Sequence, residues 1–128
     1  MRSYSVADAG VAIQVGSKWL DNLLSRHHVE GVDQGGQGID RRISAEALER
    51  LQIVSALTFG LGVPISSALA ITQRLFESAD HSLQLGPGLE LNLARASLRN
   101  HLAAKVVEAS DAMHARPRGR PPSSETRR

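Results

Sequence analysis

Cysteine is absent from this chain of 128 residues, and aromatic residues make up only 3% of it. The absence of cysteine excludes disulfides, thiolate metal ligands and cysteine nucleophiles, and it fits a reducing compartment. With so few aromatic side chains, the core has to consist of Leu, Ile, Val and Ala, a composition that favours helices. An apolar fraction of 41% is enough for a compact core, so we expect one domain plus an appendage.

The motifs of common enzymes and metal sites are also missing. GGQG is not followed by the Gly-Lys-Ser/Thr of a P-loop, and no Gly-x-Ser-x-Gly elbow occurs. His27 and His28 are adjacent, so on a helix they point about 100° apart and do not chelate one ion together. We therefore expect no enzyme, no metal site and no cofactor. The N-terminal MRSYSVADAG lacks the apolar run of a secretory signal, and we expect a cytoplasmic protein.

Negative charge is scarce at one end of the chain. Residues 114–128 hold five Arg and one Glu, whereas residues 1–113 hold ten basic and twelve acidic groups, so the net charges are +4 and −2. This asymmetry predicts that a nucleic acid or another polyanion binds the C-terminal end. A tail that only keeps the protein in solution is the alternative.

One uncharged stretch, residues 51–73, is long enough to span a bilayer. Gly60, Gly62 and Pro64 interrupt it, and several serine and threonine side chains occur within it. Two amphipathic helices that meet at a tight turn explain the pattern, and we expect no membrane span. A membrane-associated hairpin remains the third and weakest alternative.

Helical spacing and capping residues predict four helices in the first part of the chain. Ser5 with Asp8 begins a helix over 6–13, and Ser17 caps a second one over about 17–28. Ser44 caps a third helix over about 45–60, and Pro64 suits the first turn of a fourth. The buried faces of the second and third helices consist of Trp19, Leu20, Leu23 and Leu24, and of Leu48, Leu51, Val54 and Leu57. The glycine-rich segment 30–40 predicts a small hairpin with strands at Val32 and at Ile39 and Ile43.

The second part of the chain predicts a β-hairpin and a helix. Leucines alternate on both sides of Gly-Pro-Gly between residues 83 and 93, and an amphipathic helix follows over about 94–113 with Leu98, Leu102, Val106, Ala109 and Met113 on one face. We divide the chain into a domain over 1–78, a hairpin with helix over 79–114 and a disordered basic tail over 115–128. Because an isolated hairpin is marginal in water, its leucine face has to pack on the last helix, on the first domain or on a second copy. Since a leucine-faced hairpin with one amphipathic helix is too small to stand alone, we expect a homodimer formed through residues 82–113.

Two stretches carry a family resemblance, YSVADAGVAIQVGSKWLDNLLSR and, after the glycine-rich segment, RRISAEALERLQIVSALTFGLGVPISSALAI. Their order resembles the MerR-type winged helix-turn-helix, which has four helices and a small β wing. The resemblance implies that the helix beginning at Ser17 enters the major groove of DNA. Its candidate contact residues are Ser17, Lys18, Asn22 and Arg26, with Arg41 and Arg42 holding the DNA backbone beside the wing.

The sequence departs from the family pattern at the turn and on the second helix. Gln14 stands where the turn of the family usually has glycine. Asp21, Asn22 and Leu23 stand where the family often has an arginine followed by aromatic residues, and an acidic group there repels phosphate. Residues 1–81 hold seven basic and nine acidic groups, so we expect this domain alone to bind DNA weakly.

The tail contains Pro-Arg-Gly-Arg-Pro, residues 117–121, which resembles the core of an AT-hook. Gly119 lets the backbone lie on the floor of a narrow minor groove, and Arg118 and Arg120 extend along it. Because A·T tracts have the narrowest and most negative minor groove, the tail predicts a preference for A·T-rich DNA.

Together these patterns favour a small protein that binds double-stranded DNA, a transcriptional regulator associated with the nucleoid. The alternative is an adaptor that keeps the winged-helix fold and binds another protein through the leucine hairpin. The acidic balance of residues 1–81 favours that alternative.

Overall fold

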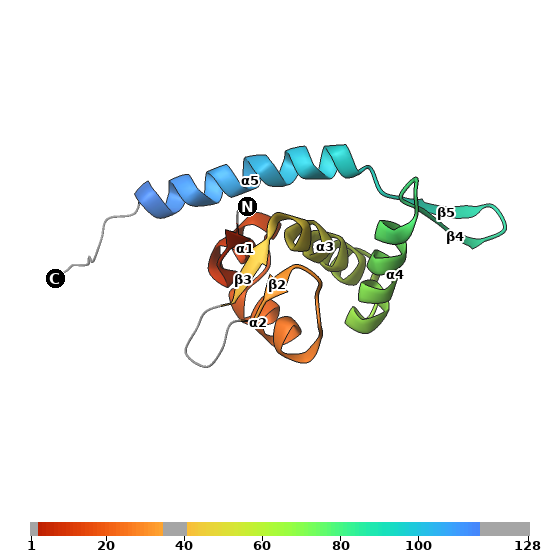
Figure 1. Ribbon diagram of the computed structural model, residues 1–128, viewed down its shortest axis with the longest axis horizontal. Helices are drawn as coiled ribbons and strands as arrows, with labels where there is room; N and C mark the ends of the chain where they lie inside the picture. Colours follow the sequence, from red (N-terminus) through yellow and green to blue (C-terminus); the bar gives the residue numbers. More distant parts are fainter. Residues whose placement is uncertain (1–2, 35–40, 116–128) are drawn as a thin grey trace.

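The computed structural model describes residues 3–34 and 41–115, with side chains up to residue 109. It is mainly helical with two small antiparallel sheets (Figure 1). The helices are α1 (Val6–Ile13), α2 (Ser17–Arg26), α3 (Ala45–Ser55), the π-helix η1 (Ala56–Gly60), α4 (Ile65–Glu77) and α5 (Arg95–Ala115). The strands are β1 (Ser3–Tyr4), β2 (Val32–Asp33), β3 (Arg42–Ser44), β4 (Ser82–Gly86) and β5 (Leu89–Asn92).

Serine side chains begin two of the helices, as the sequence predicts. The Ser5 hydroxyl accepts a bond from the Asp8 N–H, and the Ser44 hydroxyl accepts one from the Ala47 N–H, both at 3.1 Å. The prediction that Ser17 caps α2 is wrong, because Gly16 occupies the cap position and Ser17 is the first helical residue. The chain leaves the preceding turn in extended conformation at Gly16, whose carbonyl accepts the first helical bond from Leu20.

A three-stranded sheet of order β1-β3-β2 closes one side of the helical body. The sequence predicted β2 and β3, and Ile39 lies outside the described residues. It missed β1, which pairs Tyr4 with Ile43. Gly31 follows α2 at φ +91°, and a Cβ there would lie 2.5 Å from the Ser44 hydroxyl, so only glycine fits beside the cap of α3.

One hydrophobic core joins both predicted parts of the chain. Leu20, Leu51 and Val54 are fully buried in it, and Leu83 from the hairpin and Leu102 from α5 belong to the same cluster. Figure 1 shows α5 along one side of this body and α2 on the opposite side. The boundary predicted at residue 78 therefore divides elements that share a core.

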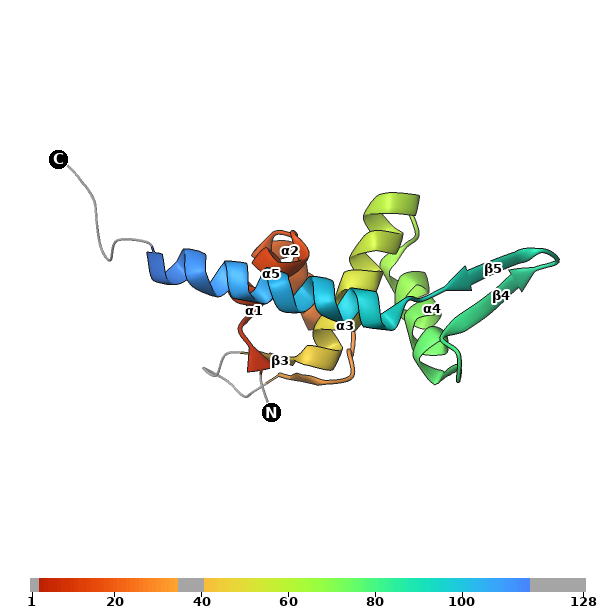
Figure 2. The same cartoon turned by 90° about the horizontal axis from the view of Figure 1, so that it is seen from above.

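The β4–β5 hairpin projects away from the helical body in both views (Figures 1 and 2). The sequence predicted a single leucine face, and the structure divides it: Leu83 is buried, whereas Leu85 and Leu89 are exposed. An irregularity between Gln84 and Gly86 shifts the register of the hairpin. The tip of the hairpin therefore presents apolar side chains to solvent.

Candidate nucleic-acid interface

Helix α2 has a buried face and an exposed polar face. Leu20, Leu23 and Leu24 are buried, because their spacing places them on the side that meets α1 and the rest of the core. The four predicted contact residues lie on exposed positions of the same helix: Ser17, Lys18, Asn22 and Arg26. The structure thus exposes all four to solvent on one helix.

The turn between α1 and α2 is fixed by an unusual residue. Gln14 ends α1 in the left-handed conformation, with φ 62° and ψ 44°, and its N–H bonds to the carbonyls of Gly10 and Val11. A residue with a side chain is strained in this conformation, which glycine adopts without cost. Gly10 makes the turn tight, since a Cβ on it would lie 2.9 Å from the Val15 carbonyl oxygen.

Arg41 connects the start of β3 to α2 instead of extending into solvent. Its guanidinium binds the Asp21 carboxylate and the Gln34 side-chain oxygen, and it donates to the Ser25 hydroxyl at 2.9 Å. Only 24% of the Arg41 side chain is exposed, against 53% for Asp21. The positive charge of Arg41 therefore offsets the acidic group that the sequence placed on the exposed face of α2.

Arg42 points the other way along the sheet. It donates to the hydroxyl of Ser3 at 3.2 Å and to the Ser3 backbone carbonyl at 3.0 Å. Both of these acceptors are uncharged, the residue is exposed, and Asp33 lies opposite it in the strand register. The two arginines that the sequence treats as equivalent thus differ among the residues that the structure describes: Arg41 donates to a carboxylate, and Arg42 donates to the hydroxyl and carbonyl of Ser3.

Sequence reasoning missed the residues that hold these arginines and an apolar contact behind α2. Ser3, Ser25 and Gln34 gave no signal, because their roles depend on contacts across the fold.

Trp19 packs at 5.1 Å, ring centre to ring centre, on Phe59 of the π-helix. Phe59 remains 64% exposed, and the prediction that Trp19 faces the protein interior holds in part, since its ring is half-buried.

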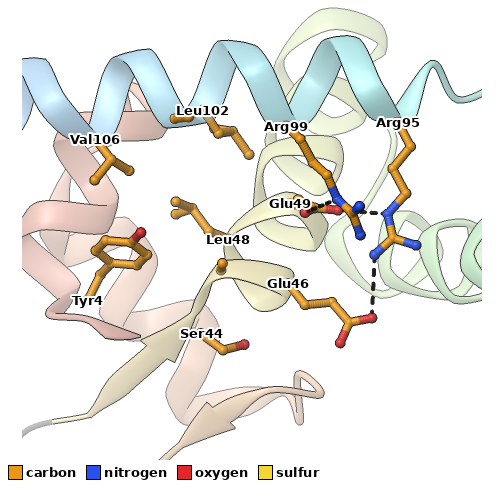
Figure 3. Close-up of a pocket in the computed structure, with 11 residues that line it drawn as sticks. Tyr4, Ser44, Glu46, Leu48, Glu49, Arg95, Arg99, Leu102 and Val106 are labelled. Carbon is orange, nitrogen blue, oxygen red and sulfur yellow. Dashed lines mark hydrogen bonds and ion pairs between the residues drawn. The ribbon is translucent and has the colours of Figure 1, made fainter. Parts of the chain in front are cut away.

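On the opposite side of the body, arginines of α5 bind acidic residues of α3 (Figure 3). The buried carboxylate of Glu49 accepts from Arg95 Nε at 2.8 Å and from Arg99 Nε at 2.9 Å. Two guanidiniums lie over the Phe76 ring, with the Cζ of Arg50 at 4.2 Å and that of Arg95 at 4.6 Å from its centre. The sequence holds one signal for this cluster: Arg95 and Arg99 are four residues apart, so they lie on the same face of a helix and can bind one acidic group together.

A cavity of about 510 Å³ lies between the start of α3, strand β1 and α5. Figure 3 shows an apolar end and a charged end. Tyr4, Leu48, Leu102 and Val106 line the apolar end, and Glu46, Glu49, Arg95 and Arg99 line the charged end.

The predicted tail contacts Arg118, Gly119 and Arg120 lie outside the described residues, as does the glycine-rich tip at 35–40. Within residues 3–34 and 41–115, the structure contains no cluster of His, Asp or Glu suited to a metal ion. No helix in that part of the chain has both the length and the apolar character needed to cross a bilayer. Comparisons of the chain with protein-family models, with curated proteins and with solved structures each find no match.

Proposed function

We propose that the protein is a small regulator of transcription that binds double-stranded DNA, with α2 in the major groove. The observation that carries this proposal is the exposed polar face of α2, which has Lys18 and Arg26 on it and a short strand pair beside it. Asn22 is suited to bind an adenine edge through both atoms of its amide, and Arg26 to bind guanine or phosphate. A buried leucine face on the same helix holds these side chains on a rigid element.

The electrostatics of this face support the proposal once Arg41 is taken into account. An unpaired carboxylate at Asp21 would repel phosphate, but Arg41 binds it. Arg42 is exposed and donates to the hydroxyl and the carbonyl of Ser3, so it is the wing arginine that we assign to a phosphate. Arg41 then acts by holding β3 against α2.

The cations on the described face are few, so the tail has to supply much of the attraction to DNA. It carries five of the fifteen Lys and Arg of the chain. We propose that Arg118 and Arg120 lie along an A·T-rich minor groove with Gly119 at its floor, which adds a second anchor to a weakly basic domain.

The test compares the full chain with a variant that lacks residues 115–128, in electrophoretic shift assays on A·T-rich and G·C-rich duplexes of equal length. The deletion should leave the circular dichroism spectrum unchanged and weaken binding to A·T-rich DNA in particular. Arg118→Ala with Arg120→Ala should reproduce most of the loss. Arg127→Ala with Arg128→Ala is the matched control, because it removes the same charge outside the motif.

Equal affinity of the full and shortened chains for both duplexes would show that the tail only keeps the protein in solution. If the full chain binds neither duplex at low salt, the proposal of DNA binding fails as a whole. A minor-groove drug should compete with the full chain and leave the shortened chain unaffected.

The adaptor hypothesis is the second candidate, and the apolar surface of η1 favours it. Phe59 is 64% exposed and packs on Trp19, and Leu61, the residue after η1, is 74% exposed. An adaptor needs no DNA affinity, so elution from heparin separates the two functions: a DNA-binding protein elutes late, and it elutes earlier without its tail. Early elution of both forms would favour the adaptor.

We also propose a homodimer, now through the hairpin tip rather than through all of residues 82–113. The leucine face of α5 contributes to the core of its own chain, whereas Leu85 and Leu89 are half or more exposed. Light scattering at ~50 µM tests this, with Leu85→Ser and Leu89→Ser as the variants that should yield monomers. A monomeric full chain at that concentration would exclude the dimer.

A further inference from the structure

The cavity beneath α5 is open to solvent on one side and has apolar groups at one end and charged groups at the other. Its volume of about 510 Å³ lies within the range of about 300–1,000 Å³ that is typical of pockets for small molecules. Leu48, Leu102 and Val106 form one end, and the guanidiniums of Arg95 and Arg99 lie at the other (Figure 3). A ligand that fits both ends has a hydrocarbon part and a polar head.

The ion pairs at the charged end of the cavity determine which charge the polar head of a ligand should carry. Glu49 is buried, and its two oxygens are taken up by the Nε atoms of Arg95 and Arg99. Glu46 lies 3.6 Å from Arg95 and 3.9 Å from Arg50, so its charge is also offset. The carboxylates of the pocket are thus already matched by arginines.

Arg99 is the residue of the charged end that can still donate hydrogen bonds to a ligand. It uses Nε alone for Glu49, and its two terminal nitrogens have no partner among the residues that the structure describes. Its side chain is 58% exposed at the mouth of the cavity. A planar guanidinium edge with two free N–H pairs matches a carboxylate in geometry and in charge.

We propose that this cavity binds a small amphipathic carboxylate, with the carboxylate on the terminal nitrogens of Arg99 and the hydrocarbon chain against Leu48, Leu102 and Val106. The Tyr4 ring closes the apolar end. This site is separate from the face of α2, so it does not depend on the proposed DNA binding.

The probe is octanoate, titrated into the full chain at concentrations below micelle formation. Tyr4 is the only tyrosine of the sequence and it lines the cavity, so its ring protons report occupancy directly in NMR spectra. We expect a saturable shift of these signals, with a dissociation constant on the order of 1 mM or below. Octan-1-ol and octylammonium carry the same chain with a neutral and a positive head, and each should bind at least about tenfold more weakly.

Two variants locate the ligand. Arg99→Ala should weaken octanoate binding by about tenfold, whereas Arg74→Ala, which removes an exposed arginine that does not line the cavity, should leave it unchanged. Ala103→Phe fills the cavity from an exposed position of α5 without removing a contact, and it should abolish the Tyr4 shift in a protein that stays folded.

The proposal is overturned if the Tyr4 signals show no saturable shift, or if octan-1-ol binds as tightly as octanoate. Unchanged octanoate binding by Arg99→Ala or by a folded Ala103→Phe variant would also overturn it. These readouts involve no DNA, so failure here is distinct from failure of the DNA-binding proposal.

Discussion

Helices α2 and α5 cover the same core from opposite sides, yet they use their charged residues differently (Figure 1). On α5, Arg95 and Arg99 are bound to a buried carboxylate of α3 and hold the helix in place. On α2, Lys18 and Arg26 are exposed, and the inner face of the helix is made of leucines. The paired arginines of α5 thus stabilise the fold, whereas Lys18 and Arg26 of α2 point to solvent, where a partner can reach them.

The largest expected effect comes from removing the carboxylate that anchors α5. Glu49→Ala leaves two arginines without their shared acceptor beside the core, and we expect the free energy of unfolding to fall by about 2–3 kcal/mol. Urea unfolding measures this, and hydrogen exchange should show faster exchange in α5.

The matched control is Glu108→Ala. Glu108 is an exposed residue of α5 that lies 3.7 Å from Lys105, and such a surface pair contributes about 0–0.5 kcal/mol. If both variants lose the same stability, the ionic contacts of α5 do not hold it in place and the contrast with α2 disappears.

The two wing arginines sharpen the comparison on the α2 side. Arg42→Ala should weaken DNA binding by about 1 kcal/mol and lower the salt slope by about one unit, because it removes an exposed positive charge that we assign to a phosphate. Arg41→Ala should lower the salt slope less, because Arg41 is bound to Asp21 and not assigned to a phosphate. It should still weaken DNA binding, because it leaves Asp21 unpaired beside the phosphates, and it should cost about 1 kcal/mol of folding stability.

Binding isotherms at several salt concentrations and urea unfolding of both variants check this pair. An equal drop in salt slope for both arginines would mean that Arg41 leaves Asp21 when DNA binds. No change for either arginine would favour the adaptor hypothesis.

The turn before α2 offers a smaller effect of opposite sign. Gln14 sits in the left-handed conformation, so Gln14→Gly should stabilise the fold by about 0.5–1 kcal/mol in thermal unfolding. Ala70→Gly, at an exposed right-handed position within α4, should instead destabilise it by about 1 kcal/mol. Loss of stability in the Gln14 variant would show that its side chain makes a contact worth more than the strain.

The smallest effect concerns the loop after α4. The hydroxyls of Ser78 and Ser82 donate to the Asp80 carboxylate at 2.7 and 2.8 Å, and these bonds hold its pKa below the ordinary 3.8. A lowered pKa in the folded state means that the stabilising contribution is present above pH 3.8 and is lost as the pH falls through the lower, folded value. In Ser78→Ala with Ser82→Ala, the NMR titration of Asp80 should move upward towards 3.8; an unchanged midpoint would assign the shift to another cause.

The sequence predicts most of the helices here, because leucine spacing and serine caps are local signals. Ser5 and Ser44 are examples, since each cap depends on a residue three positions away. It predicts the exposed face of α2 for the same reason. The pairing of Arg41 with Asp21 and of Arg99 with Glu49 was not predictable, because it joins residues 20 and 50 positions apart that only the fold brings together.

The third predicted helix, 45–60, is confirmed in its bounds, but the type of helix changes at its end. The last five residues, Ala56–Gly60, form a π-helix, whose bonds span one residue more than those of an α-helix. In effect one amino acid has been inserted into a regular helix, so a helical wheel drawn over 45–60 is out of phase by about 100° beyond that point. Deleting one residue of this segment should restore the α-helical phase and turn Phe59 away from Trp19. The π-helix is therefore the reason that the ring of Phe59 reaches the ring of Trp19 on α2.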